Sequence, residues 1–159
     1  MIVLSLSLLT AACGPVPPLS STFSSEHALA DRVLEALAAR DIAALQALPL
    51  SEREFREAVW PELPSSQPDA NLPVDYAWGT LRQNSEAHLG RLLEAHGGRE
   101  YRLVRVRFEG PATPYRTFVV RRPPLITVRD EQGVEREVRL FGSVIERPRA
   151  YKLFSYVTD

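Results

Sequence analysis

The hydrophobic period of the chain changes near Arg99, and this change limits the possible folds more than any other feature. Before Arg99, apolar side chains recur at helical spacing, as in Leu29, Val33 and Leu37. After it, apolar and charged side chains alternate, as in the stretch "REYRLVRVRFEG", which is the pattern of a half-buried strand. Helices followed by strands predict an α+β domain, with N-terminal helices packed on a curved antiparallel meander sheet of four or five strands.

Polar residues with capping ability mark the starts of the predicted helices. They are, in chain order, Ser24 or Ser25, Asp41, the pair Ser51 and Glu54, and Asp75. The pair has the S-x-x-E spacing of a capping box. Residues 61–73 are rich in turn formers and predict a long loop. The main helix follows this loop and ends at Gly97-Gly98.

One glycine interrupts the longest predicted strand. Gly142 follows a hairpin that turns at "DEQG", and a glycine inside a strand often marks a bend. A bend there would let the sheet curl around the main helix. Phe141 and Ile145 are expected to share a sheet face with Arg139. An apolar patch on the outer face of the sheet would favour assembly into dimers.

The first residues resemble a lipoprotein signal. "IVLSLSLL" is too short to span a bilayer but suits the apolar region of a secretory signal, and Ala11 and Ala12 precede the single cysteine, Cys13. This stretch resembles the lipobox of bacterial lipoproteins. The resemblance implies diacylation of the Cys13 sulfur, cleavage before it, and, because Gly14 follows, the outer membrane. No Lys or Arg precedes the apolar run, and a start codon placed too late would account for this.

Three segments follow from this interpretation: a signal peptide at 1–12, a lipidated cysteine and Pro-rich linker at 13–23, and one domain at 24–159. Prolines would hold the linker extended and lift the domain off the headgroups. A lone cysteine excludes an intrachain disulfide. We therefore expect an envelope protein that faces the periplasm.

The start of the folded part, "RVLEALAARDIAALQAL", is similar to the opening of the nuclear transport factor 2-like superfamily. There, an amphipathic helix is followed by small residues, an Asp and a short helix, and a third helix and a bent antiparallel sheet complete a cone around an apolar pocket. The resemblance implies either an enzyme acting on a small hydrophobic molecule, of isomerase, dehydratase or hydrolase type, or a binding or assembly module that can pair as a homodimer. It places no catalytic residue on this chain.

Three residues on the apolar stripe of the main helix are candidate pocket residues: Trp78, Ser85 and His96. Each also has a structural interpretation. Trp78 suits the core, and the Ser85 hydroxyl can bond a backbone carbonyl within the helix. His96 suits a helix C-terminus but could also act as a general base at a pocket mouth. Glu86 lies off the stripe, so we expect its carboxylate to be solvated.

Several classes of function are disfavoured by the sequence. The net charge is −1, and the three histidines lack metal-ligand spacing, so we expect no metal, no cofactor and no nucleic acid. The half before Arg99 carries an excess of acidic residues, and the half from Arg99 an excess of basic ones. We interpret the basic half as a sheet whose wet face carries Arg. The preferred function is a non-enzymatic binding or accessory module that contacts a small hydrophobic ligand or a protein partner.

Overall fold

The computed structural model describes residues 15–158, so the predicted signal peptide and Cys13 lie outside the described part. The helical elements come first, in the order α1 (Glu26–Ala38), α2 (Ile42–Ala47), α3 (Glu52–Glu54), the single turns η1 (Phe55–Val59), η2 (Trp60–Glu62), η3 (Pro64–Ser66) and η4 (Pro68–Ala70), and α4 (Val74–His96). Strands follow, which confirms the predicted α+β class. No helix within residues 15–158 is long and apolar enough to cross a bilayer.

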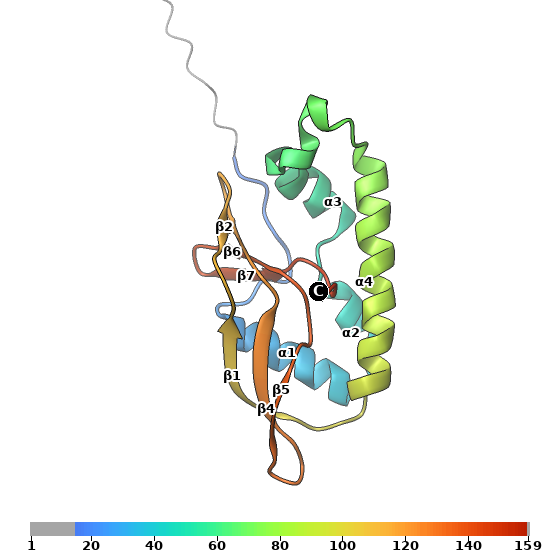
Figure 1. Cartoon of the computed structure of the whole chain (residues 1–159), viewed down its shortest axis with the longest axis vertical. Helices are drawn as coiled ribbons and strands as arrows, with labels where there is room; N and C mark the ends of the chain where they lie inside the picture. Colours follow the sequence, from blue (N-terminus) through green and yellow to red (C-terminus); the bar gives the residue numbers. More distant parts are fainter. Residues whose placement is uncertain (1–14, 159) are drawn as a thin grey trace, which may run out of the picture.

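The strands form two antiparallel sheets. The first has the order β1-β4-β5 and the second the order β2-β3-β6-β7. Their bounds are β1 (Arg102–Phe108), β2 (Thr113–Pro114), β3 (Val119–Arg121), β4 (Pro124–Arg129), β5 (Glu135–Val138), β6 (Val144–Arg147) and β7 (Ala150–Leu153). Figure 1 shows both sheets on one side of the molecule and α4 standing along the other, with α1 across the lower half.

The two sheets are the halves of one bent meander. Three pairs of strands are consecutive in the chain and each forms one interrupted strand: β1 with β2, β3 with β4, and β5 with β6. In the first sheet β4 lies between β1 and β5, and in the second β3 lies between β2 and β6, so the three interrupted strands have the same order in both sheets. Each break contains a proline, which lacks the N–H that a ladder needs, or a glycine, which allows a bend: Pro111, Pro123 and Gly142. Gly142 lies between β5 and β6, as the predicted bend requires. A Cβ on it would lie under 3.0 Å from the backbone carbonyl oxygens of Ser155 and Val157, so the C-terminal segment needs this glycine for its close approach.

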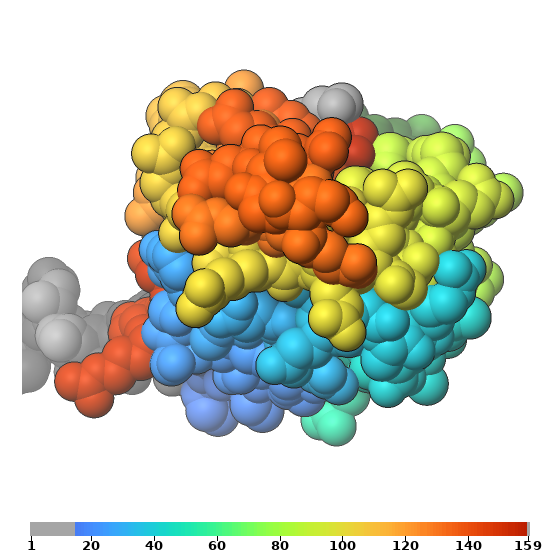
Figure 2. All heavy atoms as spheres, turned by 90° about the horizontal axis from the view of Figure 1, so that it is seen from below, coloured from blue at the N-terminus to red at the C-terminus, as the bar shows by residue number. Residues whose placement is uncertain are grey.

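The larger hydrophobic cluster, here called the main core, lies between α1 and the sheets. Its buried members come from α1, α2, α4, β4, the segment 140–144 and the C-terminal segment. Leu29, Val33 and Leu37 are fully buried in it, which accounts for the apolar stripe of α1. Figure 2 shows this lower end, with the hairpin between β4 and β5 (orange) standing above α1 (blue).

A smaller cluster, here called the upper cluster, lies at the end of the molecule where the described chain begins. Six apolar side chains are buried in it: Leu50, Phe55, Ala58, Val59, Phe118 and Ile145. The long loop expected at 61–73 begins here and consists largely of the single turns η2 to η4. The first residues of each turn include a proline, whose missing N–H costs nothing at that position.

Two expectations about single residues are wrong. Phe141 and Ile145 are 1% and 0% exposed and belong to the two clusters. The alternation that would have placed them beside the exposed Arg139 does not run through this segment, because β5 ends at Val138 and β6 begins at Val144. Asp75 does not cap α4. The helix begins one residue earlier, after Pro73, and the Asp75 carboxylate instead accepts a hydrogen bond from Arg56.

Candidate functional site

A cleft of about 360 Å³ lies between α4 and the two segments that face it. The α4 wall carries Trp78, Leu81, Ser85 and Leu89. The connection from α2 to α3 supplies a second wall through Pro49 and Leu50, and residues 154–156 after β7 supply the third. This cleft lies in the size range of small-molecule sites, and its walls are mainly apolar. A cleft with these properties suits a small hydrophobic ligand.

Ser85 connects two walls of the cleft. The residue is buried, and its hydroxyl oxygen accepts a hydrogen bond from the backbone N–H of Tyr156 at 3.0 Å. The Tyr156 hydroxyl in turn donates to the carbonyl oxygen of Leu45 at 2.7 Å. These two bonds hold the C-terminal segment between α4 and α2. The cleft therefore has a fixed floor, and Ser85 fixes it by a contact across the fold that helical spacing alone does not reveal.

The indole of Trp78 forms the upper part of the α4 wall. Its ring centroid lies 5.4 Å from that of Phe55, with the rings tilted by 37°. Phe55 also contacts Trp60, at 5.7 Å between centroids. The three rings belong to the upper cluster, so Trp78 serves both as core and as cleft lining.

The charged groups at the rim of the cleft neutralise each other. Arg82 and Glu86, one turn apart on α4, form an ion pair at 3.0 Å, and both side chains are more than half exposed. Glu86 is therefore solvated, as its place off the apolar stripe predicts. Burial raises the pKa of the Tyr156 phenol far above its ordinary value, so this group stays protonated and bound to Leu45. Neither arrangement offers the ligand a free acid or base.

A second, smaller cavity of about 180 Å³ lies near the C-terminal end of α4. His88, Arg91, His96 and Arg139 are its basic lining residues. The Nδ1 atom of His96 lies 3.1 Å from the Tyr101 hydroxyl. Burial, with a smaller effect of nearby arginines, lowers the pKa of both histidines, so both rings are neutral at physiological pH.

The structure brings together two of the three predicted pocket residues. Trp78 and Ser85 line the cleft, whereas His96 lines the second cavity. All three share one side of α4, but eleven residues separate Ser85 from His96, which is about 16 Å along a helix axis. Tyr156 lines both cavities and lies between the two sites. The angular position of each residue around α4 therefore predicted the side of the helix on which it lies, but not the cavity that it lines.

Sequence analysis missed a buried ion pair between Glu54 and Lys152. The Lys152 Nζ lies 3.5 Å from the Glu54 carboxylate, and the two side chains are 1% and 7% exposed. Burial raises the pKa of Glu54, but the hydrogen bonds from Ser51 and Ser20 and the Lys152 charge outweigh it, so the pKa lies below its ordinary value. Burial also lowers the pKa of Lys152, against the opposing effect of Glu54. The capping box was the one available signal, and it is present.

Within residues 15–158, no group of three or more His, Cys, Asp or Glu side chains is placed to hold a metal ion. Comparison with protein-family models, with curated proteins and with solved structures gives no match. The functional argument therefore rests on the geometry of this chain.

Proposed function

We propose that this chain is a bacterial envelope lipoprotein, anchored through Cys13, whose domain binds a small apolar ligand in the cleft beside α4. The observation that carries the binding role is the cleft itself. It is open, it is walled by Trp78, Leu81 and Leu89 on one side, and its floor is fixed by the Ser85–Tyr156 bond. Apolar walls with few polar groups are typical of sites that bind hydrophobic molecules.

The polar groups of the cleft favour binding over catalysis. A catalytic acid or base is expected to face the pocket with a pKa near the working pH. Among the lining residues, Tyr156 has a strongly raised pKa and is held by Leu45, and Arg82 and Glu86 are paired at the exposed rim. The resemblance to the nuclear transport factor 2-like superfamily stays a prediction, and the order of helices and bent meander supports it.

The ligand proposal can be tested with 1-decanol as a probe, using the tryptophan fluorescence of the domain, to which Trp78 in the cleft wall and Trp60 contribute. We expect 1-decanol to change the tryptophan emission of the wild-type domain in a saturable manner. Leu81→Arg should abolish the change, because a long charged side chain would occupy the apolar wall. Gln83→Arg, on an exposed part of the same helix, is the matched control and should bind as the wild type does. Equal responses of both variants would reject the cleft as the site.

The anchor can be tested by weighing the mature protein. The chain, expressed with its native signal, should lose residues 1–12 and gain the mass of acyl chains, and Cys13→Ala should gain none. Stable attachment requires more than one acyl chain. Each buried methylene contributes about 0.8 kcal/mol, and a single acyl chain gives only reversible membrane binding. Recovery of the intact, unmodified chain from the cytosol would reject the lipoprotein interpretation.

An enzymatic role is the second candidate, and the His96–Tyr101 contact favours it. A neutral histidine that contacts a tyrosine hydroxyl beside a cavity could act as a general base. This role predicts turnover of a small hydrophobic molecule that falls strongly in His96→Gln. If His96 is purely structural, His96→Gln should instead lower the stability of the domain without any change in turnover per folded molecule.

A further inference from the structure

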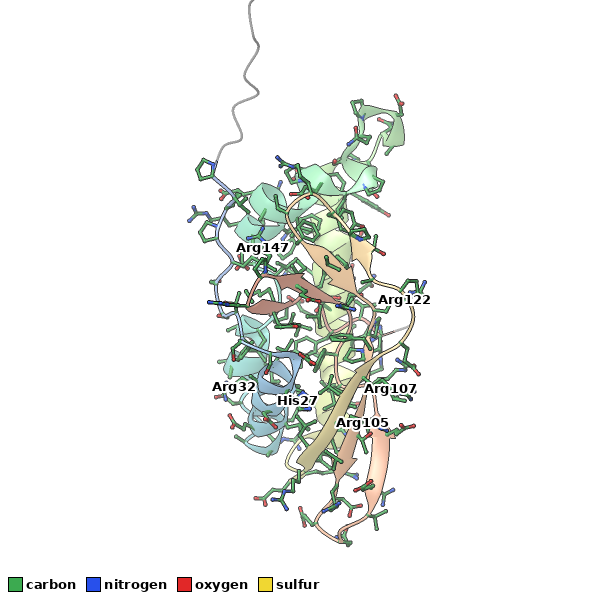
Figure 3. All side chains as sticks on the ribbon, turned by 90° about the vertical axis from the view of Figure 1, so that its left-hand side faces the viewer. His27, Arg32, Arg105, Arg107, Arg122 and Arg147 are labelled. Carbon is green, nitrogen blue, oxygen red and sulfur yellow. The ribbon has the colours of Figure 1, made fainter. Side chains whose placement is uncertain are left out.

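The segment expected to be a free linker is bound to the domain from Pro17 onward. We call residues 17–23 the strap. At its first residue, the Pro17 carbonyl oxygen accepts a hydrogen bond from Arg147 Nη1 at 2.7 Å. At its last residue, Phe23 exchanges two backbone hydrogen bonds with Tyr151, at 2.9 and 2.8 Å, and so extends the sheet beyond β7. Figure 3 shows the strap running beside the labelled Arg147.

The middle of the strap completes the shell of the buried ion pair. The backbone N–H and the hydroxyl of Ser20 both donate to Glu54 Oε1. The other carboxylate oxygen accepts from Ser51 and faces Lys152. Release of the strap would leave Oε1 of a buried carboxylate without these donors, which is unfavourable because a buried charge needs hydrogen-bond partners.

Arg147 gives the strap a second reason to stay bound. Its Nε and Nη2 atoms are buried and have no hydrogen-bond partner within the described residues. Within the described residues, the bond from Nη1 to Pro17 is therefore the one hydrogen bond of the guanidinium, and loss of the strap would remove it. Leu19 adds an apolar contact, since it packs against the upper cluster.

The bound strap shortens the reach of any anchor at Cys13. Eleven linker residues in an extended proline-rich conformation would reach about 34 Å, at about 3.1 Å per residue. With the strap bound, only the four steps from Cys13 to Pro17 are left, which span at most about 14 Å. This limit holds whatever conformation those residues adopt. The end of the domain around Pro17 and Arg147 must then lie close to the surface that holds the anchor.

We propose, on the basis of the lipidation of Cys13 proposed above, that the strap holds the domain end-on against the phospholipid headgroups. In this orientation the loop that carries η3 and η4 and the turn between β2 and β3 face the membrane, and the turn between β4 and β5 points away from it. Figure 1 shows the strap entering at the end opposite to the β4–β5 turn. Arg116, exposed in the β2–β3 turn, places a guanidinium where it can meet headgroup phosphates.

The test uses the full-length lipidated protein in vesicles of phosphatidylethanolamine and phosphatidylglycerol that carry a nitroxide quencher on the headgroup. Acylation consumes the Cys13 thiol, so a single added cysteine can be labelled with a fluorophore. Asp69→Cys, in the exposed turn η4, reports the membrane-facing end, and Gln132→Cys reports the opposite turn. We expect quenching to be several-fold stronger at position 69 than at position 132.

A strap variant shows whether the strap is the cause. Ser20→Pro removes both donors to Glu54 Oε1 at an exposed position, and it should reduce the quenching difference between the two labels. Ser24→Ala, a nearby exposed hydroxyl, should leave the difference unchanged. Equal quenching at both positions in the lipidated wild type, or a difference that survives Ser20→Pro, would overturn this proposal alone. A protein whose mass shows no acyl chains would overturn the lipoprotein proposal as well.

Discussion

The main core and the upper cluster stabilise the two ends of one domain by different means. The main core buries seventeen side chains, all apolar apart from the Tyr156 hydroxyl, which has a partner. The upper cluster buries six apolar side chains and stands beside the Glu54–Lys152 ion pair and the strap. Apolar burial is indifferent to pH, whereas a buried charge pair depends on the ionisation of both groups and on every hydrogen bond around it. The upper end should therefore be the part of the domain that responds to pH and to strap contacts.

The largest expected effect comes from breaking this ion pair. Glu54→Gln leaves Lys152 buried without a counter-charge, and loss of one partner of a buried pair typically costs about 3–5 kcal/mol of unfolding free energy. Urea denaturation measures the loss. The control is Glu57→Gln, since this half-exposed carboxylate pairs with Arg53 at the surface, and such pairs contribute about 0–1 kcal/mol. Similar losses in both variants would show that the upper end does not depend on the buried charge.

The pH dependence of the wild type sharpens the same contrast with a smaller change. The pKa of folded Glu54 lies below its ordinary value, so its contribution is complete above the unfolded pKa, about 4.3, and is lost as pH falls through the folded pKa. Lys152 and Arg147 stay protonated throughout this range. The stability difference between wild type and Glu54→Gln should thus be constant near neutrality and shrink below about pH 4. A difference that grows on acidification would contradict the assigned direction.

Gly142→Ala tests whether the two ends are connected through the C-terminal segment. The added methyl group would meet the backbone carbonyls of Ser155 and Val157, which cannot move without disturbing the Tyr156–Ser85 bond. Overpacking of this kind costs about 1–3 kcal/mol. Thermal unfolding measures the cost, and 1-decanol binding should weaken with it because the cleft floor shifts. Unchanged stability would mean that the segment adjusts freely and does not fix the cleft.

Local sequence signals predicted local structure well. The caps at Ser25 and Asp41 and the capping box of Ser51 with Glu54 are all present, because each depends on contacts within four residues. The change of hydrophobic period predicted the helical and strand halves for the same reason. These features do not depend on how distant segments meet.

The features that sequence reasoning missed depend on long-range contacts. The burial of Glu54 requires Ser20 and Lys152, which are distant in sequence and come from the strap and from β7. The separation of His96 from Ser85 depends on Tyr156, which only the fold places between two cavities. The capping box at Glu54 does not indicate that its carboxylate is buried, and the apolar stripe of α4 does not indicate that Ser85 and His96 line different cavities.

The smallest expected effects come from two glycines of α4, the partly buried Gly79 near the upper cluster and the exposed Gly90 near the main core. A Cβ on Gly79 or Gly90 would have open space around it, so alanine should favour the helix by up to about 1 kcal/mol. The buried residues of α4 are Ser85 at its middle and Leu89 and Leu92 in the half that contains Gly90. We therefore expect Gly90→Ala to raise the global free energy of unfolding. Gly79→Ala should mainly slow hydrogen exchange in the first turns of α4, where local opening needs less energy. Equal global gains from both variants would show that α4 unfolds as one unit and that the upper end is no weaker than the main core.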